Sequence, residues 1–250
     1  MRVPDKMEKM TPARVTTIKA ALGTLLWVAI QTAPTLCARI SLIHSECAEE
    51  DTSPRELVVE INEMIEEAKS PKYTTIMIHS FQNAESVKTW EDLGPIGFGD
   101  GSEQNRPRGG STGGAFLGIG SMDILGGESR LISPILWKSW RLDRVSRSSD
   151  DAEIQSITEA ENRVCKLRIL WTELNGHNHT MEFRYDALRR GRISAEQCRA
   201  ILAVDSRGAV DAVFDQESAN LGLKSSRAAI EAFALKQCTE DERFRLAWVK

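Results

Sequence analysis

Glycine is concentrated in one stretch of this sequence, and that concentration restricts the backbone more than any other feature. Twelve of the 17 glycines fall between Gly94 and Gly127. The stretch lacks the Gly-x-x-x-x-Gly-Lys-Ser/Thr pattern of a phosphate-binding loop, and Gly97-x-Gly99 is followed by a polar, proline-containing segment instead of a helix. The glycines therefore predict tight turns and closely packed hairpins.

The charge and cysteine content exclude several classes of protein. The 250 residues include 32 Lys and Arg against 36 Asp and Glu, a formal net charge of −4, which excludes a uniformly basic surface but allows a local basic track for nucleic acid. Five cysteines, an odd number without a Cys-x-x-Cys pair, argue against a disulfide scaffold or a structural zinc site. We therefore expect reduced thiols and a location inside the cell. The sequence does not distinguish the cytoplasm from the nucleus.

The apolar segment near the N-terminus is short. The longest apolar run, Ala20–Ile30, is too short to span a membrane, so we expect no membrane association. Arg14 and Lys19 before the run and Thr35-Leu36-Cys37-Ala38 after it leave a signal peptide as an alternative. The long preceding region and Pro12 favour the start of a helix instead.

Residues 1–70 show helical periodicity and predict a small helical unit. Thr11-Pro12 and Ser53-Pro54 are typical of an N-cap followed by proline at the first helical position. We expect a helix after Pro12, a short helix over 35–47 and a third helix after Pro54 that ends at Ser70-Pro71.

Beyond residue 72 the pattern becomes typical of strands. The strand candidates are Tyr73–His79, Pro95–Asp100, Ser111–Gly120 and Leu131–Trp137. The connector Gly101–Gly110 is polar, basic and turn-forming. The last three strands with their short links therefore predict an antiparallel meander.

A long helix and a second strand–helix region follow. Ser148, Ser149 and Asp150 can cap the helix, and its apolar stripe consists of Ile157, Ala160, Val164, Leu167, Trp171 and Leu174. Ala200–Val204 and Phe244–Trp248 are predicted strands, with helices near 207–214 and 226–238 between them. This order predicts an α/β fold in which helices pack on a mixed sheet.

Three carboxylates stand out because of where they fall. Asp100 and Asp205 each follow a predicted buried strand, where an acidic residue is usually a helix cap or a turn residue. Glu153 precedes Ile157 by four residues and so continues the apolar stripe, where it needs a partner: a helix N-terminus, a basic residue or a metal. If the helix crosses the sheet, the three carboxylates meet, and such oxygen ligands suit Mg²⁺ or Mn²⁺. Two such ions about 3.5–4 Å apart would support phosphodiester cleavage.

A basic run directly precedes the long helix. Trp137 and Trp140 lie among its members, which recur at every third position: Lys138, Arg141, Arg144 and Arg147. One interpretation is a solvated face, and the other is a set of phosphate contacts along a nucleic-acid duplex.

Several of these segments together resemble a known family. They are Gly97-Phe98-Gly99-Asp100, Ser111-Thr112-Gly113-Gly114, Pro134-Ile135-Leu136-Trp137-Lys138-Ser139, Ser148-Ser149-Asp150-Asp151-Ala152-Glu153 and Val204-Asp205-Ser206. The stretch from Gly97 to Gly176, with Asp205 beyond it, resembles the ribonuclease H domain of copia-type retrotransposon polyproteins. The Ser-Ser-x-x-Ala-Glu block, which supplies the family's catalytic glutamate, is the most specific of these segments.

The resemblance extends upstream and also has departures. Residues 22–32 are similar to the end of the reverse transcriptase in the same polyprotein. No Tyr-x-Asp-Asp polymerase motif is present, so we do not expect reverse transcription by this chain alone. The family's fourth metal-binding aspartate follows its final strand, but here the sequence stops at Lys250, and Glu231 is a poor substitute candidate.

The resemblance implies a fold and a function. The fold is a ribonuclease H-like mixed sheet, with three antiparallel strands and then a parallel strand, over residues 73–250 and truncated at its C-terminus. Residues 1–72 are a helical remnant of the reverse transcriptase thumb or connection. Catalytic Asp100, Glu153 and Asp205 would hold two Mg²⁺ or Mn²⁺ ions, with Glu231 as a further candidate ligand. They would cut the RNA strand of an RNA–DNA hybrid endonucleolytically, while Lys138, Arg141, Arg144 and Arg147 contact phosphates.

The resemblance also implies candidate partners, and it leaves one alternative function open. No small-molecule cofactor is expected, and the rest of a Pol polyprotein is a candidate partner. The alternative is a catalytically inactive, truncated retroelement relic that acts at most as a nucleic-acid-binding module. The missing fourth carboxylate favours it, because the loss of one ligand weakens a second metal site.

Overall fold

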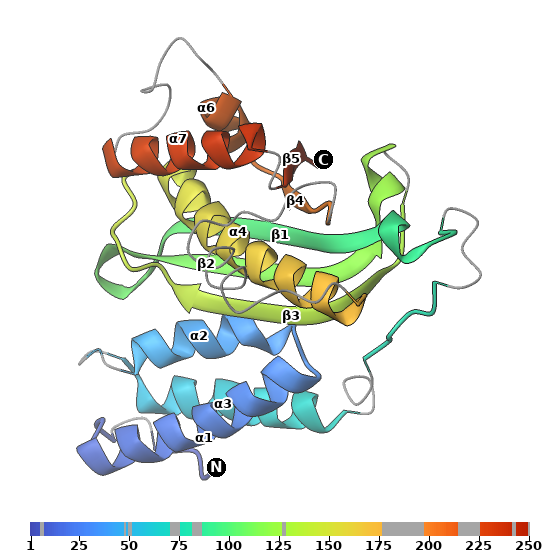
Figure 1. The fold of residues 1–250 in the computed structure, drawn as a ribbon. Helices are drawn as coiled ribbons and strands as arrows, with labels where there is room; N and C mark the ends of the chain where they lie inside the picture. The colour runs from blue at the N-terminus through green and yellow to red at the C-terminus, as the bar shows by residue number, and fades with distance from the viewer. Residues whose placement is uncertain are drawn as a thin grey trace.

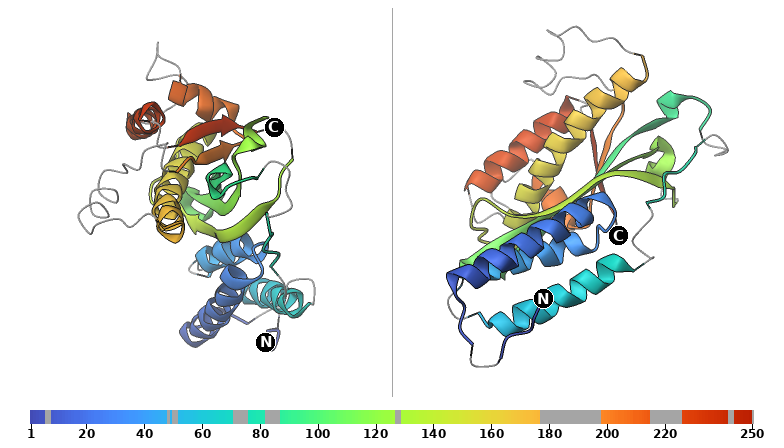
Figure 2. Two further views of the ribbon diagram at one scale, coloured as in Figure 1. Left: turned by 45° about the vertical axis from the view of Figure 1, so that its right-hand side comes forward. Right: turned by 90° about the horizontal axis from the view of Figure 1, so that it is seen from below.

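A five-stranded sheet lies between two layers of helices. The computed structural model describes residues 1–5, 8–47, 49, 52–70, 76–81, 87–126, 129–176, 198–214, 226–241 and 244–249. Figure 1 shows one helical layer formed by α1 (Pro12–Gln31), α2 (Leu36–Glu46) and α3 (Pro54–Lys69). The opposite layer contains α4 (Ser149–Leu174), α6 (Arg207–Phe214) and α7 (Ser226–Glu240), and Figure 2 shows the layers from two further directions.

The strands form the predicted mixed sheet. They are β1 (Leu93–Arg106), β2 (Gly110–Ser121), β3 (Ile132–Arg141), β4 (Ile201–Val204) and β5 (Arg245–Trp248). Their order is β3-β2-β1-β4-β5, with β1, β2 and β3 antiparallel and β4 parallel to both β1 and β5. The prediction of three antiparallel strands followed by a parallel strand is confirmed.

Helices α1 and α3 begin where their caps predict, and α2 begins within the predicted range without a side-chain cap. Thr11 accepts a hydrogen bond from the backbone N–H of Arg14, and Ser53 accepts one from Glu56. By length and composition alone, α1 is long and apolar enough to cross a membrane, which the shorter run Ala20–Ile30 did not suggest. In the structure, part of its apolar face is buried in a helical core, through Ile18, Leu22, Leu25 and Ala29.

Two predictions, one for the connector within the glycine-rich region and one for the strand before it, were wrong in detail. The connector 101–110 is mostly strand, because β1 continues to Arg106, with a register shift between Ser102 and Arg106 where Gln104 has φ 50°. The chain then turns at Pro107–Gly109, with Arg108 at φ 59° and Gly109 at φ 67°. Side-chain bonds hold this hairpin end together, including one from Thr112 Oγ1 to Asn105 at 2.7 Å. Of the predicted strand Tyr73–His79, residues 73–75 lie outside the described part of the chain and 76–79 are not in a strand.

Helix α4 packs directly on β1 because the facing strand positions lack side chains. A Cβ atom at Gly97 would lie 2.5 Å from Cγ2 of Val164, and one at Gly99 would lie 3.3 Å from Cβ of Ala160. The N-terminal half of the predicted stripe, Ile157 to Val164, is buried, whereas the C-terminal half is partly exposed and Leu174 is 80% exposed. The core between α4 and the sheet includes Leu117, Ile154, Ile157, Val164 and Leu202.

The layer of α1–α3 is attached to the opposite face of the sheet. Trp137 on β3 is part of the helical core, and its indole N–H donates to the carbonyl of Ala29 at 2.7 Å. Arg106 at the end of β1 is only 6% exposed. Its guanidinium donates to the carbonyl of Ser41 at 2.7 Å and to the hydroxyls of Ser41 and Ser45 at 2.6 and 2.7 Å. Arg106 therefore joins α2 to the strand that carries Asp100.

Loss of this guanidinium should destabilise the whole protein. We expect Arg106→Ala to lower the free energy of unfolding in urea by about 2–4 kcal/mol, because the buried guanidinium and its partly buried acceptors lose their charge-assisted hydrogen bonds. Arg108→Ala is the matched control, since the Arg108 side chain is 72% exposed and forms a surface ion pair with Glu49. The control should change the free energy by less than about 0.5 kcal/mol, and equal losses in both variants would contradict the assignment.

Candidate active site

Two of the three carboxylates are placed by the parallel pairing of β1 and β4. Phe98 is aligned with Ala203 in this pair, so Asp100 and Asp205 each come two residues after an aligned position. Strand β4 ends at Val204, whereas β1 continues beyond Asp100 in its pairing with β2. The two aspartates thus lie side by side where β1 loses its parallel neighbour.

The third carboxylate comes from the start of α4. Ser148 caps this helix, because its hydroxyl accepts from the N–H of Asp151 at 3.2 Å. The first turn lies against β1 at Gly101, where a Cβ atom would be 2.4 Å from the carbonyl oxygen of Ala152. The N–H of Gly101 donates to Oε2 of Glu153 at 3.1 Å. Glycine at position 101 therefore both admits the helix and holds the glutamate.

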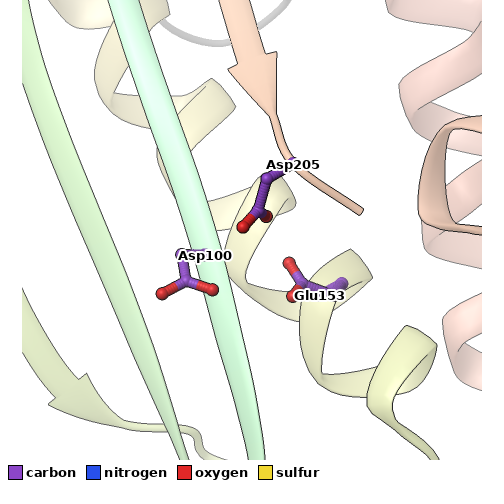
Figure 3. A group of neighbouring side chains, drawn as sticks. All are labelled: Asp100, Glu153 and Asp205. Atoms are coloured by element: carbon purple, nitrogen blue, oxygen red, sulfur yellow. The ribbon is translucent and has the colours of Figure 1, made fainter. Parts of the chain in front are cut away.

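The structure brings the three carboxylates together. Asp100, Glu153 and Asp205 each offer one oxygen atom, and these atoms all lie within 4.8 Å of one another. Figure 3 shows the three side chains around a common space between β1, the end of β4 and the first turns of α4. Glu153 is only 6% exposed, whereas Asp100 and Asp205 are open to solvent. The site therefore combines two solvent-exposed carboxylates with one buried carboxylate.

The closeness of these groups changes their protonation. Burial raises the pKa of Glu153 to about 8, and the charges of Asp100 and Asp205 add to the increase. Partial desolvation of the Asp100 carboxylate, followed by the charge of Asp205, also raises the pKa of Asp100. A divalent cation would remove this repulsion, and a set of carboxylate oxygens without nitrogen or sulfur fits the hard ions Mg²⁺ and Mn²⁺.

The predicted basic residues do not form a single line. Lys138 and Arg141 lie on β3 three positions apart, so they project from opposite faces of the sheet. Lys138 Nζ lies 5.9 Å from the centre of the Trp140 ring. Arg144 forms an ion pair with Glu231, which lies on α7 and is not part of the three-carboxylate group.

Arg144 and Arg147 line a common cavity. The cavity has a volume of about 550 Å³ and lies between the β3–α4 connection and the first turn of α7. Its lining residues are Arg144, Val145, Arg147, Gln155, Ser226, Arg227 and Ala228. The sequence did not single out Arg227, because only the folded chain brings α7 to the start of α4.

Asp150 also lies near the site, although the sequence indicated only a helix-capping role for it. Its carboxylate lies against Gly208 at the start of α6, where a Cβ atom would be 2.7 Å from Oδ1 of Asp150. Its charge also contributes to the raised pKa of Glu153. The spacing of Asp150 and Glu153, three residues apart on one helix, is the signal that could have indicated this proximity.

Comparison with known proteins gives distant structural likenesses. One solved structure is an N-terminal ribonuclease H domain from Mycobacterium tuberculosis fused to maltose-binding protein, with 16% identity, a TM-score of 0.30, and coverage of 62% of this chain and 86% of that chain. A foamy viral protease–reverse transcriptase in complex with dsDNA has 11% identity and a TM-score of 0.35, and the match covers 65% of this chain and 84% of that chain. The PFV ribonuclease H domain has 11% identity, a TM-score of 0.35 and coverage of 64% and 80%. The sequence matches no protein-family model and no curated protein.

The buried glutamate should make stability depend on pH in the absence of metal. The pKa of Glu153 is about 8 in the folded protein and near 4.5 ordinarily, so the folded state binds the extra proton. The free energy of unfolding should therefore fall as pH rises across this interval. Glu153→Gln should remove most of this slope and raise Tm at pH 8 by about 4 °C or more, measured by calorimetry in EDTA.

The matched control is Glu159→Gln, on the same helix. The Glu159 side chain is 42% exposed and pairs with Arg163, so this variant should keep the wild-type pH slope. Parallel Tm curves for wild type and Glu153→Gln would show that Glu153 is not the group responsible.

Proposed function

We propose that this chain is a retroelement-derived, ribonuclease H-like endonuclease that hydrolyses the RNA strand of an RNA–DNA hybrid. The observation that carries the proposal is the group of three carboxylate oxygens within 4.8 Å of one another. The group lies at the end of a parallel strand pair and includes the buried Glu153 at the start of a long helix. The resemblance of the surrounding motifs to copia-type polyproteins supports the choice of substrate.

Asp100, Glu153 and Asp205 would hold the divalent cations. Bound Mg²⁺ or Mn²⁺ would lower the pKa of an attacking water molecule and stabilise the leaving 3′ oxygen. The three carboxylates carry three negative charges when ionised, so two divalent cations leave one positive charge, which a phosphodiester group balances. Gly101 keeps Glu153 turned toward the site through its N–H group, and Glu153 would have to be ionised to hold a cation.

Basic residues around the site would bind the backbone of the substrate. Arg147 lines the cavity beside the start of α4 together with Arg144, which is paired with Glu231. Lys138 and Arg141 would add phosphate contacts from opposite faces of β3. Guanidinium groups suit phosphate oxygens because they donate two parallel hydrogen bonds. Recognition of the hybrid would then rest on groove shape and 2′-hydroxyl groups and not on base sequence.

The helices α1–α3 would be a remnant of the reverse transcriptase that precedes such a domain. Their sequence similarity to the end of that enzyme supports this origin, with a boundary near residue 72. In a longer polyprotein, the remaining parts of Pol would be the natural partners of this layer.

The proposal predicts metal-dependent cleavage that requires all three carboxylates. With a labelled RNA–DNA hybrid and Mg²⁺ or Mn²⁺, we expect RNA cleavage by the wild type. Asp100→Asn, Glu153→Gln and Asp205→Asn should each reduce the rate at least about 100-fold, because each removes a candidate metal ligand. Glu159→Gln, on the same helix as Glu153, should keep the wild-type rate. A wild-type protein that binds the hybrid without cutting it would support the inactive-relic alternative.

Hybrid binding should depend on the basic residues independently of cleavage. We expect Arg147→Ala to weaken hybrid affinity in Ca²⁺ and to reduce the slope of log affinity against log salt by about 1, because one phosphate contact is lost. Lys69→Ala, which changes an exposed lysine on α3, should leave affinity and slope unchanged. Equal effects of the two substitutions, measured by fluorescence anisotropy across a salt series, would contradict the assigned binding surface.

A further inference from the structure

Ser156 makes an unusual pair of contacts directly behind the acidic site. It lies on α4 and is completely buried. Its hydroxyl lies 2.5 Å from the carbonyl oxygen of Asp100 and 3.1 Å from that of Gly114. These two carbonyls belong to residues that are aligned in the β1–β2 pair. Ser156 thus contacts β1 and β2 at one aligned pair of residues, and one of these residues, Asp100, carries a site carboxylate.

The chemistry of this contact is not that of an ordinary helix serine. A serine inside a helix commonly donates to the carbonyl four residues earlier in the same helix. Thr158 does so on the same helix, with a bond to Ile154. Ser156 instead donates its only hydroxyl hydrogen outside the helix, between two strand carbonyls. The bond therefore fixes the position of α4 on the sheet and not the helix itself.

The contact is also one helical turn away from Glu153. Residues three positions apart lie on the same face of a helix, so Ser156 and Glu153 approach β1 together. Ser156 holds the backbone of Asp100, while Gly101 holds the carboxylate of Glu153. Two hydrogen bonds of opposite direction thus join consecutive residues of β1 to one turn of α4.

We propose that Ser156 is a positioning residue that sets the separation of the Asp100 and Glu153 carboxylates. The Ser156 hydroxyl holds α4 on β1 at the backbone of Asp100, and the N–H of Gly101 holds the carboxylate of Glu153, so together they fix the spacing between the two elements that carry these carboxylates. The residue holds the metal-free site in the arrangement that binds cations. This inference rests on the proposed metal-dependent function but concerns a residue that does not itself touch the ions.

Calorimetric titration of the metal-free protein with Mn²⁺ tests this role without any cleavage. We expect Ser156→Ala to weaken Mn²⁺ binding about 5-fold or more and Ser156→Cys, which keeps a weaker and longer donor, to have an intermediate effect. In a cleavage assay, Ser156→Ala should need more Mg²⁺ for half-maximal rate, should regain activity at high Mg²⁺, and should bind hybrid as well as wild type. A purely structural role would lower Tm without these changes.

Ser133→Ala is the matched control. Ser133 is a buried strand serine that accepts from the N–H of His79 at 2.8 Å and donates to its carbonyl at 3.3 Å, so it also has two backbone partners. It should keep wild-type Mn²⁺ affinity. Unchanged Mn²⁺ affinity in Ser156→Ala, alongside a wild type whose binding is lost in Asp100→Asn, would overturn the role of Ser156 alone. A wild type that does not bind Mn²⁺ would overturn both this role and the proposed metal-dependent function.

Discussion

The close contact between α4 and β1 is the constraint on which the rest of this structure depends. Three alternate positions of β1 face the helix without side chains, and a Cβ atom at Gly97 or Gly101 would lie within 2.5 Å of helix atoms. This absence of side chains lets the first turn of the helix reach the strand, so Glu153 meets Asp100. The glycine-rich stretch therefore sets the distance between the two elements that carry the acidic groups.

The strand that carries Asp100 is also held from the opposite face of the sheet. Arg106, six residues farther along β1, bonds to the two serines of α2, while Ser156 bonds to Asp100 itself. The same strand is thus fixed by a helix of each layer. A site with three repelling carboxylates needs such support, because the charges favour separation of their backbones until a cation is bound. The helices α1–α3 consequently contribute to the rigidity of β1 without reaching the site.

The sequence allowed much of this arrangement to be predicted, for physical reasons that can be stated. Acidic residues after two buried strands and one on the core face of a helix must meet if the strands are parallel and the helix crosses them. The structure has this pairing and brings Asp100, Glu153 and Asp205 together. The contacts that hold them there were not predictable. The hydroxyl of Ser156 finds its acceptors on β1 and β2, and no local pattern indicates which strand carbonyls lie above a given helix residue.

The basic run Lys138, Arg141, Arg144 and Arg147 also shows why a sequence pattern did not predict where side chains lie. A spacing of three places residues on one face of a helix, but in a strand it places neighbours on opposite faces. Lys138 and Arg141 fall on β3 and are separated in this way, whereas Arg144 and Arg147 fall after the strand and line one cavity. Arg144 is also paired with Glu231, so that each neutralises the other in the structure. For Glu231 to act as a fourth ligand, this ion pair would have to break, whereas the charge of Asp150 already raises the pKa of Glu153.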